Sequence, residues 1–132
     1  MINPVTAIPA ATSAEALAHF SKEFEFETDC WDTHEGLKLS PKQFVLLDVR
    51  SKALYDQGHV PGAISLPHGK IVESKISQWP QDILFVTYCA GPHCNGAARG
   101  AVRLANLGRK VKLMAGGITG WQDEGFELAK TQ

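Results

Sequence analysis

The sequence has little of what marks several large protein classes. Its 132 residues include only three cysteines, an odd number that argues against a small scaffold held together by disulfides. Lysine and arginine number 13 against 14 acidic residues, and neither sign is clustered, which excludes a nucleic-acid surface or a polybasic membrane patch. The longest apolar runs are the length of a strand, far short of a membrane span. We therefore expect small molecules or proteins as partners, and neither nucleic acid nor a membrane.

The first residues also lack the features of an export signal. Residues 1–11 contain no lysine or arginine and include Pro4 and Pro9, which does not match the charged and then apolar pattern of a signal peptide. A reducing compartment would suit a working thiol. We expect a cytoplasmic protein.

What the chain does contain is the composition of one ordinary globular domain. Hydrophobic residues make up 44% and charged residues 20% of the sequence, enough to bury one real core. We predict a single domain over residues 1–132, with a core over about 44–126. The amino-terminal part, about residues 1–40, is predicted to add a helix, an edge strand and a short helix to this core.

The amino-terminal part begins with a helix signal. Thr12 and Glu15 have the spacing of a capping box, and apolar residues follow at helical intervals, which predicts a helix over residues 13 to about 23. Residues 24–28 then alternate apolar and acidic side chains, the pattern of a half-exposed edge strand. A short helix is predicted over residues 29–39, before a turn at Pro41.

Two segments of the core have the pattern of central parallel strands. Residues 44–49 and 83–88 are nearly continuous apolar runs, as expected of strands buried on both faces. Shorter strands are predicted at 63–66 and 111–114, and helices at 71–79, 95–107 and 118–124, with a further helix between Ser51 and Gly58. This alternation predicts an α/β fold with an open, mostly parallel sheet flanked by helices.

Cys89 follows the second central strand and opens a short loop before a predicted helix. The loop and the first helical position are Ala90, Gly91, Pro92, His93, Cys94 and Asn95. A thiol between the end of a strand and the start of a helix meets free backbone N–H groups and the positive end of the helix dipole. In such a setting a cysteine pKa can fall from about 8.5 to roughly 3.5–7.5. The residues therefore predict nucleophilic, covalent chemistry at Cys89.

Asp48 ends the first central strand, as Cys89 follows the second. Ligands of open parallel sheets bind at the carboxyl ends of the strands, so we expect Asp48 and Cys89 to face one crevice. A carboxylate at the end of a buried strand must find hydrogen-bond donors. Arg50 and nearby loop N–H groups are the candidates.

Three segments together resemble the rhodanese superfamily of sulfurtransferases. They are LDVR at 47–50 with YDQGHVPGAI at 55–64, the strand, loop and helix around Cys89, and GGITGW at 116–121. The resemblance covers about residues 44–126 and implies the rhodanese-like fold, with helices on both faces of the sheet. It implies that Cys89 carries sulfane sulfur as a persulfide, with Asp48 and Arg50 bracing the site. No cofactor is expected.

On this hypothesis the Cys89 thiolate takes sulfur from thiosulfate, polysulfide or a low-molecular-weight persulfide. A thiol, cyanide or a sulfur-accepting protein then removes it. Loop N–H groups curled around the sulfur would stabilise the thiolate and the persulfide anion, and Gly91 and Gly96 would allow that close approach. His59 is expected to be a buried hydrogen-bonding residue rather than a catalyst.

The other cysteines and His93 leave alternatives open. Cys94 stands where many members of the family carry Ser, Thr or Arg, and its thiol could donate to the persulfide, act as a resolving thiol or merely fill space. Cys30, beside Trp31, is expected to be a half-buried spectator. His93 either attracts an anionic donor or is an exposed spectator. No second Cys/His pair completes a tetrahedral set with the loop, so no metal is expected.

Two other function classes compete with a sulfurtransferase. A cysteine phosphatase of related fold needs arginine six positions after the nucleophile to hold phosphate; that position is Asn95, and the loop is one residue shorter than in that class, so a phosphatase is disfavoured. The alternative is a non-catalytic redox or sulfide sensor, or an interaction module, that uses Cys89 and Cys94. The loop also lacks the lysine or arginine by which some relatives bind thiosulfate, which leaves the donor open.

Overall fold

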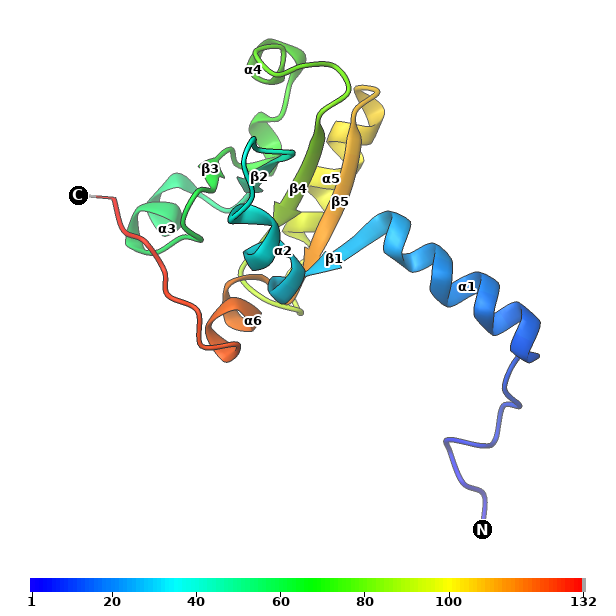
Figure 1. Cartoon of the computed structure of the whole chain (residues 1–132). Coiled ribbons are helices and arrows are strands. Elements are labelled where there is room, and N and C mark those ends of the chain that lie inside the picture. Colours follow the sequence, from blue (N-terminus) through cyan, green and yellow to red (C-terminus); the bar gives the residue numbers. More distant parts are fainter. Residues whose placement is uncertain (132) are drawn as a thin grey trace.

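A parallel sheet of five strands forms the centre of the molecule (Figure 1). The computed structural model describes residues 1–131, and its strands lie in the order β1-β5-β4-β2-β3. They are β1 (Glu27–Asp29), β2 (Phe44–Asp48), β3 (Ile64–Ser65), β4 (Leu84–Tyr88) and β5 (Lys110–Ala115). Every neighbouring pair runs parallel. The predicted open parallel sheet is confirmed.

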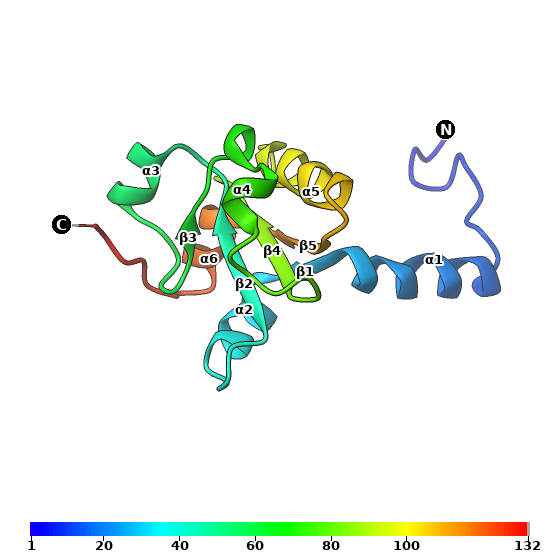
Figure 2. The same cartoon turned by 90° about the horizontal axis from the view of Figure 1, so that it is seen from above.

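Helices cover both faces of the sheet (Figure 2). On one face lie α2 (Cys30–Leu37) and α6 (Gly117–Asp123), and on the other α4 (Glu73–Ile76) and α5 (Gly96–Asn106). Helix α3 (Lys52–Gln57) and the 3-10 turn η1 (His68–Lys70) belong to the connections that follow β2 and β3.

The central strands are almost entirely apolar because their side chains pack on both faces of the sheet. On β4, Val86 belongs to the apolar cluster that contains Trp121 of α6, whereas Phe85 belongs to the cluster that contains Leu104 of α5. Successive side chains of a strand point to opposite sides. A strand covered on both sides therefore needs an unbroken apolar run, which is the pattern that identified it in the sequence.

Helix α1 (Ser13–Phe26) extends away from the sheet and carries the amino terminus at its far end (Figure 1). The N-cap half of the predicted capping box is present, because the Glu15 N–H donates to Thr12 Oγ1 at 3.2 Å. The Glu15 carboxylate accepts from the Thr12 hydroxyl at 2.8 Å, in place of the backbone N–H of a full capping box. None of the side chains of α1 is buried. Within residues 1–131, no helix is long and apolar enough to cross a membrane.

The edge strand predicted over residues 24–28 is wrong in position. Phe24 and Phe26 form the last turn of α1, and β1 begins only at Glu27. An alternating pattern favours a strand when one of its faces packs on a core, but here Phe24 is 74% and Phe26 58% exposed. The helix therefore continues until the Glu27 N–H closes its last turn on Glu23 O.

The helix predicted over residues 71–79 is much shorter than expected. The β-branched residues Ile71 and Val72 have extended backbones, and α4 is a single turn that ends at Ile76. Ile71 and Ile76 are both buried in the cluster on the α5 side of the sheet. The apolar residues are thus spaced by the burial of the connection between β3 and β4, and only the centre of residues 71–79 is helical.

Candidate active site

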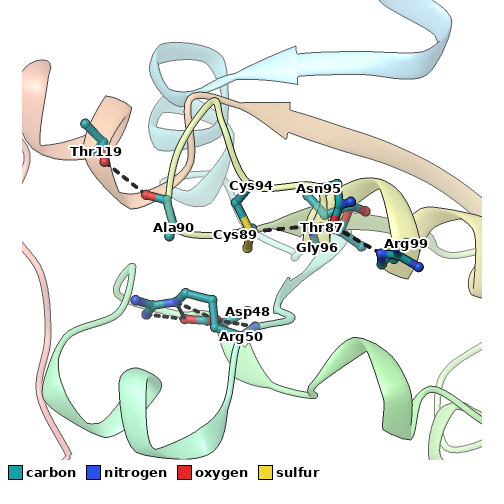
Figure 3. The surroundings of a disulfide bond; sticks show 11 residues. Asp48, Arg50, Thr87, Cys89, Ala90, Cys94, Asn95, Gly96, Arg99 and Thr119 are labelled. Atoms are coloured by element: carbon teal, nitrogen blue, oxygen red, sulfur yellow. Dashed lines mark hydrogen bonds and ion pairs between the residues drawn. A yellow bond between two sulfur atoms is a disulfide. The ribbon is translucent and has the colours of Figure 1, made fainter.

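Cys89 lies at the carboxyl edge of the sheet, directly after β4 (Figure 3). Tyr88, the residue before it, is the register partner of Asp48 at the end of β2. The Val49 N–H donates to Tyr88 O at 3.2 Å, which continues the pairing of the two strands to the site. The ends of β2 and β4 therefore lie side by side. Contrary to expectation, Asp48 does not share a crevice with Cys89, because it is 0% exposed; Val49 and Arg50, the residues after it, line the cleft with Cys89 instead.

The loop after β4 brings two sulfurs together. Cys89 and Cys94 are joined by a disulfide, with their Cα atoms 6.3 Å apart. Cys89 is only 6% exposed, whereas Cys94 lies at the surface. The N–H of Gly96, the first residue of α5, donates to Cys94 Sγ at 3.4 Å. The structure therefore places Cys94 in direct contact with Cys89.

Gly96 leaves the space that both sulfurs occupy. A Cβ at this position would lie 2.8 Å from Cys89 Sγ and 3.4 Å from Cys94 Sγ. Gly91, in the middle of the loop, is equally restricted, because its Cβ would lie 2.9 Å from Thr119 Oγ1. Gly96 allows the close approach to the sulfur that was expected of both glycines, whereas Gly91 makes room for α6 instead.

The backbone of the GGITGW motif at 116–121 binds the loop that begins at Cys89. Two of its N–H groups donate to loop carbonyls, Ile118 to Cys89 O at 3.1 Å and Thr119 to Ala90 O at 3.0 Å, and the Thr119 hydroxyl adds a bond to Ala90 O at 3.1 Å. Gly117 has a φ of 59°, and its Cβ would overlap Cys89 O. The motif is glycine-rich because the chain turns here in a left-handed conformation directly against the loop.

Asp48 has the donors that its burial requires. It is 0% exposed, and Arg50 holds it with Nη2 at 2.7 Å from Oδ2 and Nε at 3.0 Å from Oδ1. The Arg50 backbone N–H donates to Oδ1 at 3.0 Å, and the Tyr88 hydroxyl donates to Oδ2 at 2.8 Å. The same Arg50 Nη2 donates to Gly58 O at 2.6 Å. The network joins the ends of β2 and β4 to the chain that follows α3.

Arg50 and Tyr88 both keep their protons near neutral pH. Burial lowers the pKa of Arg50, but the hydrogen bonds and the charge of Asp48 outweigh it, so the pKa is raised. Burial, together with the charge of Asp48, also raises the pKa of Tyr88 above its usual value. Tyr88 therefore remains a hydrogen-bond donor over the physiological range, and the carboxylate of Asp48 is fully engaged in bracing the strand ends.

His59 packs next to the Asp48, Arg50 and Tyr88 network. It is 8% exposed, its Nδ1 lies 2.7 Å from Tyr55 O, and its ring stacks on that of Tyr55 with centroids 3.7 Å apart. Its backbone bonds to Ala129. These contacts agree with a buried hydrogen-bonding residue.

Two clefts meet at the cysteine pair. One, of about 250 Å³, lies between the loop and β5. The other, of about 430 Å³, lies toward β2 and is lined by Val49, Arg50, Ser51, Leu54, Pro67, His68, Gly69, Cys89, Ala90, Cys94, Asn95 and Gly96. Apart from the cysteines, its ionisable residues are Arg50, whose charge is paired with Asp48, and His68. No carboxylate is among the lining residues, so no like charge opposes an anionic ligand in this cleft.

Sequence reasoning missed the side of the cleft that includes Leu54, Pro67, His68 and Gly69. These residues follow β2 and β3, so the rule that ligands bind at the carboxyl ends of parallel strands could have indicated them. His93, in contrast, lies exposed on the loop and lines neither of these two clefts.

The polar side chains at the start of α5 face solvent. Asn95 does not cap the helix with its side chain; its Oδ1 accepts from Arg99 Nε at 3.1 Å. Arg99 and Arg103 are exposed. No group of three or more His, Cys, Asp or Glu residues within residues 1–131 is placed to hold a metal ion.

Cys30 is more deeply placed than predicted. The sequence indicated a half-buried residue, but it is 4% exposed because α2 packs it against the turn between β5 and α6. Its Sγ lies 3.5 Å from Ala115 O and 3.6 Å from Gly117 O. Burial, with the nearby charges of Asp29, Glu124 and Asp123, raises its pKa to about 11.

The raised pKa predicts that Cys30 resists alkylation in the folded, reduced protein. With a pKa of about 11, only about one thiol in a thousand is ionised near pH 8, and the thiolate is the reactive form. Iodoacetamide should modify Cys94 first and Cys30 last, with Cys30 labelling rising as the pH approaches 11. Peptide mass spectrometry measures this, with protein unfolded in guanidinium as the control. Equal labelling of Cys30 and Cys94 in the folded protein would contradict the assignment.

Gly96→Ala should separate activity from stability. Alanine suits a helix better than glycine by up to about 1 kcal/mol, so the melting temperature should change little. Its methyl group must displace Cys89 Sγ, however, and a shift of about 1 Å at a reacting atom can cost roughly a hundredfold in rate. Any Cys89-dependent activity should fall by about that factor. Gly69→Ala is the control, because a Cβ there meets nothing within 4 Å in the same cleft; equal losses in both variants would contradict the prediction.

Comparison with known proteins agrees with this geometry. A family model of the rhodanese-like domain matches residues 32–124. The HTH-type transcriptional regulator Rv0324 of Mycobacterium tuberculosis is 36% identical over 87 residues, which cover 65% of this chain and 38% of that protein. The chain thus spans well under half of the length of that relative.

Solved structures give the same result. The BH2092 protein from Bacillus halodurans aligns with a TM-score of 0.86 and 37% identity over 91% of this chain and 88% of that chain. The rhodanese-like domain of the Alr3790 protein from Anabaena aligns with a TM-score of 0.69 and 24% identity, over 79% of this chain and 78% of that chain. A thiosulfate sulfurtransferase from Pseudomonas aeruginosa aligns at 0.67 and 20% identity, over 85% of this chain and 21% of that one. The last two are likenesses of fold.

Proposed function

Because the chain belongs to the rhodanese-like domain family, we propose that it is a sulfurtransferase in which Cys89 carries sulfane sulfur as a persulfide. The observation that supports this most is the placement of Cys89. It lies between the end of β4 and the start of α5, and it lines a cleft whose other ionisable residues, Cys94 aside, are basic. A thiol at the amino end of a helix, in an open cleft without an acidic lining residue, suits a nucleophile that attacks anionic sulfur donors.

The reaction requires no external oxidant or reductant once the cysteines are reduced. The Cys89 thiolate attacks the outer sulfur of thiosulfate, the S–S bond of the donor breaks, and sulfite leaves with the electron pair. Cyanide then attacks the outer sulfur of the Cys89 persulfide, thiocyanate leaves, and the thiolate is restored. A thiol acceptor would take the same sulfur as its own persulfide. Arg50 and His68 line the cleft through which the anionic donor would approach.

The test is a donor screen with the reduced protein. Thiosulfate, inorganic polysulfide and glutathione persulfide are each offered with cyanide under anaerobic conditions, and thiocyanate is measured. We expect repeated turnover with at least one donor. No thiocyanate above the uncatalysed rate from any of the three would contradict the proposal.

A second candidate is a redox-responsive or sulfide-responsive interaction module. The Cys89–Cys94 disulfide supports it, as does a relative that is named a transcriptional regulator. Such a module would change between dithiol and disulfide without turning over a donor. A donor screen without turnover, together with ready formation of the disulfide under mild oxidant, would favour this candidate over the enzyme.

A further inference from the structure

We propose that Cys94 is an internal resolving thiol that displaces the sulfur carried by Cys89, so that the protein reduces sulfane sulfur to hydrogen sulfide. This inference rests on the proposed persulfide at Cys89. The protein would stop at the Cys89–Cys94 disulfide after each such event, until a dithiol reductant restores the two thiols. The fate of the sulfur would then depend on whether an external acceptor or Cys94 reaches the persulfide first.

The first argument is the reach of Cys94. The disulfide shows that Cys94 Sγ meets Cys89 Sγ within the folded loop, where the Cys94 N–H also donates to Gly91 O at 3.2 Å. The absence of a Cβ at Gly96 leaves room for both sulfurs at once. A group held this close to its target competes with external thiols through a high effective concentration.

The second argument is the surroundings of the Cys94 sulfur. The Gly96 N–H donates to it at 3.4 Å. Because Gly96 is the first residue of α5, this N–H has no carbonyl partner within the helix. A backbone donor at a helix terminus favours the thiolate, which is the form that attacks. Cys94 is also exposed, so a dithiol reductant in solution can reach the disulfide through it.

The third argument is the space around the pair. Cys89 and Cys94 line both clefts, so the two sulfurs lie on the wall that separates them. The outer sulfur of a Cys89 persulfide can extend into the cleft that contains Arg50 and His68 while Cys94 approaches from the loop. A departing hydrosulfide ion then has an open route to solvent.

The step is a thiol–disulfide exchange at the inner sulfur. The Cys94 thiolate attacks Cys89 Sγ, the Sγ–Sγ bond forms, and the bond between Cys89 Sγ and the outer sulfur breaks. The outer sulfur leaves as HS⁻ with the electron pair and takes a proton from water. In sum, Cys89–S–SH and Cys94–SH give the disulfide and H₂S. The sulfane sulfur is reduced, the two thiols are oxidised, and a dithiol supplies the two electrons that regenerate them.

The experiment is a single turnover without external thiol. Wild-type protein and Cys94→Ser are reduced, freed of reductant under anaerobic conditions and mixed with thiosulfate whose outer sulfur is isotopically heavy. Polysulfide replaces thiosulfate if the latter does not load Cys94→Ser. Heavy sulfide is trapped and measured, and the intact mass of each protein is recorded. Cys94→Ala, which also lacks the thiol at this exposed position, is measured in the same way.

The wild type should release about one sulfide per chain and lose the mass of two hydrogens. Cys94→Ser should instead gain the mass of one sulfur and release sulfide at least about tenfold more slowly, because it lacks the neighbouring thiol. A wild type that keeps its persulfide, on either cysteine, and passes it to cyanide would overturn the inference and leave the proposed function intact. Equal sulfide release by both proteins would also overturn it. If neither protein takes up sulfur from either donor, the inference fails, and the proposed function fails with it if the donor screen also gives no thiocyanate.

Discussion

Cys89→Ser is expected to abolish sulfur transfer in a protein that remains folded. Serine has nearly the shape of cysteine, but its hydroxyl does not ionise near neutral pH and does not carry sulfane sulfur. Loss of a nucleophile with no substitute removes the reaction path, so the rate of thiocyanate formation should fall by at least about a thousandfold. The measurement uses pre-reduced proteins, so that loss of the Cys89–Cys94 disulfide does not enter the comparison.

Cys94→Ser is the matched control, because it replaces the other loop thiol by the same residue. It should keep a substantial part of the rate with cyanide, since Cys89 and its place between β4 and α5 are unchanged. Under mild oxidant it should form no intramolecular disulfide and leave Cys89 open to over-oxidation. Complete and equal loss of turnover in both folded variants would mean that the two cysteines act as an obligatory pair, and a mechanism with one nucleophile would have to be abandoned.

Asp48→Ala should cause the largest loss of stability among the site substitutions. Asp48 is 0% exposed and accepts from Arg50 and Tyr88, whose side chains would keep their burial and lose their partner. Breaking a buried ion pair from one side costs roughly 3–5 kcal/mol, against a total stability of about 5–15 kcal/mol for a typical protein. Sulfur transfer should fall as well, because the network joins the two strand ends that frame the site.

Two variants make this prediction testable even if Asp48→Ala does not fold. Asp56→Ala removes an exposed carboxylate that pairs with Lys52 at 2.9 Å, and its melting temperature should stay close to that of the wild type. Tyr88→Phe keeps the ion pair but leaves the Val60 N–H without its acceptor, at a cost of about 1–3 kcal/mol. Unchanged melting temperature and unchanged turnover in Asp48→Ala would show that Asp48 braces nothing.

The sequence predicted the parts of the fold in which burial and periodicity agree. The runs at β2 and β4 are apolar because both faces of each strand are covered, and that condition is visible in the sequence. Thr12 and Glu15 predicted the start of α1 because a cap is a local interaction between residues three apart. The alternating pattern that includes Phe24 and Phe26 predicts a strand only if these side chains pack on a core. They do not, and the local sequence does not indicate this.

In the candidate site, too, local patterns predicted some residues, whereas others depend on contacts between distant parts of the chain. Cys89 and Asp48 could be placed because each follows a strand, and strand ends in parallel sheets meet at one edge. The bond between Cys89 and Cys94 could be raised only as one alternative, because it depends on the curl of the loop and on the space left at Gly96. The burial of Cys30 under the Gly117 turn joins residues far apart in sequence, and no local signal indicates it.

The central claim is tested most directly by locating the sulfane sulfur. In the wild type, one tryptic peptide, between the cleavage sites Lys75 and Arg99, contains both loop cysteines. The Cys94→Ser variant is therefore used, because Cys89 is then the only thiol in this peptide. This protein is exposed to donor, alkylated, digested and mapped by mass spectrometry before and after cyanide. The account predicts one added sulfur on Cys89, removed by cyanide, and none on Cys30. Stable, cyanide-labile sulfur on Cys30 with none on Cys89 would contradict it.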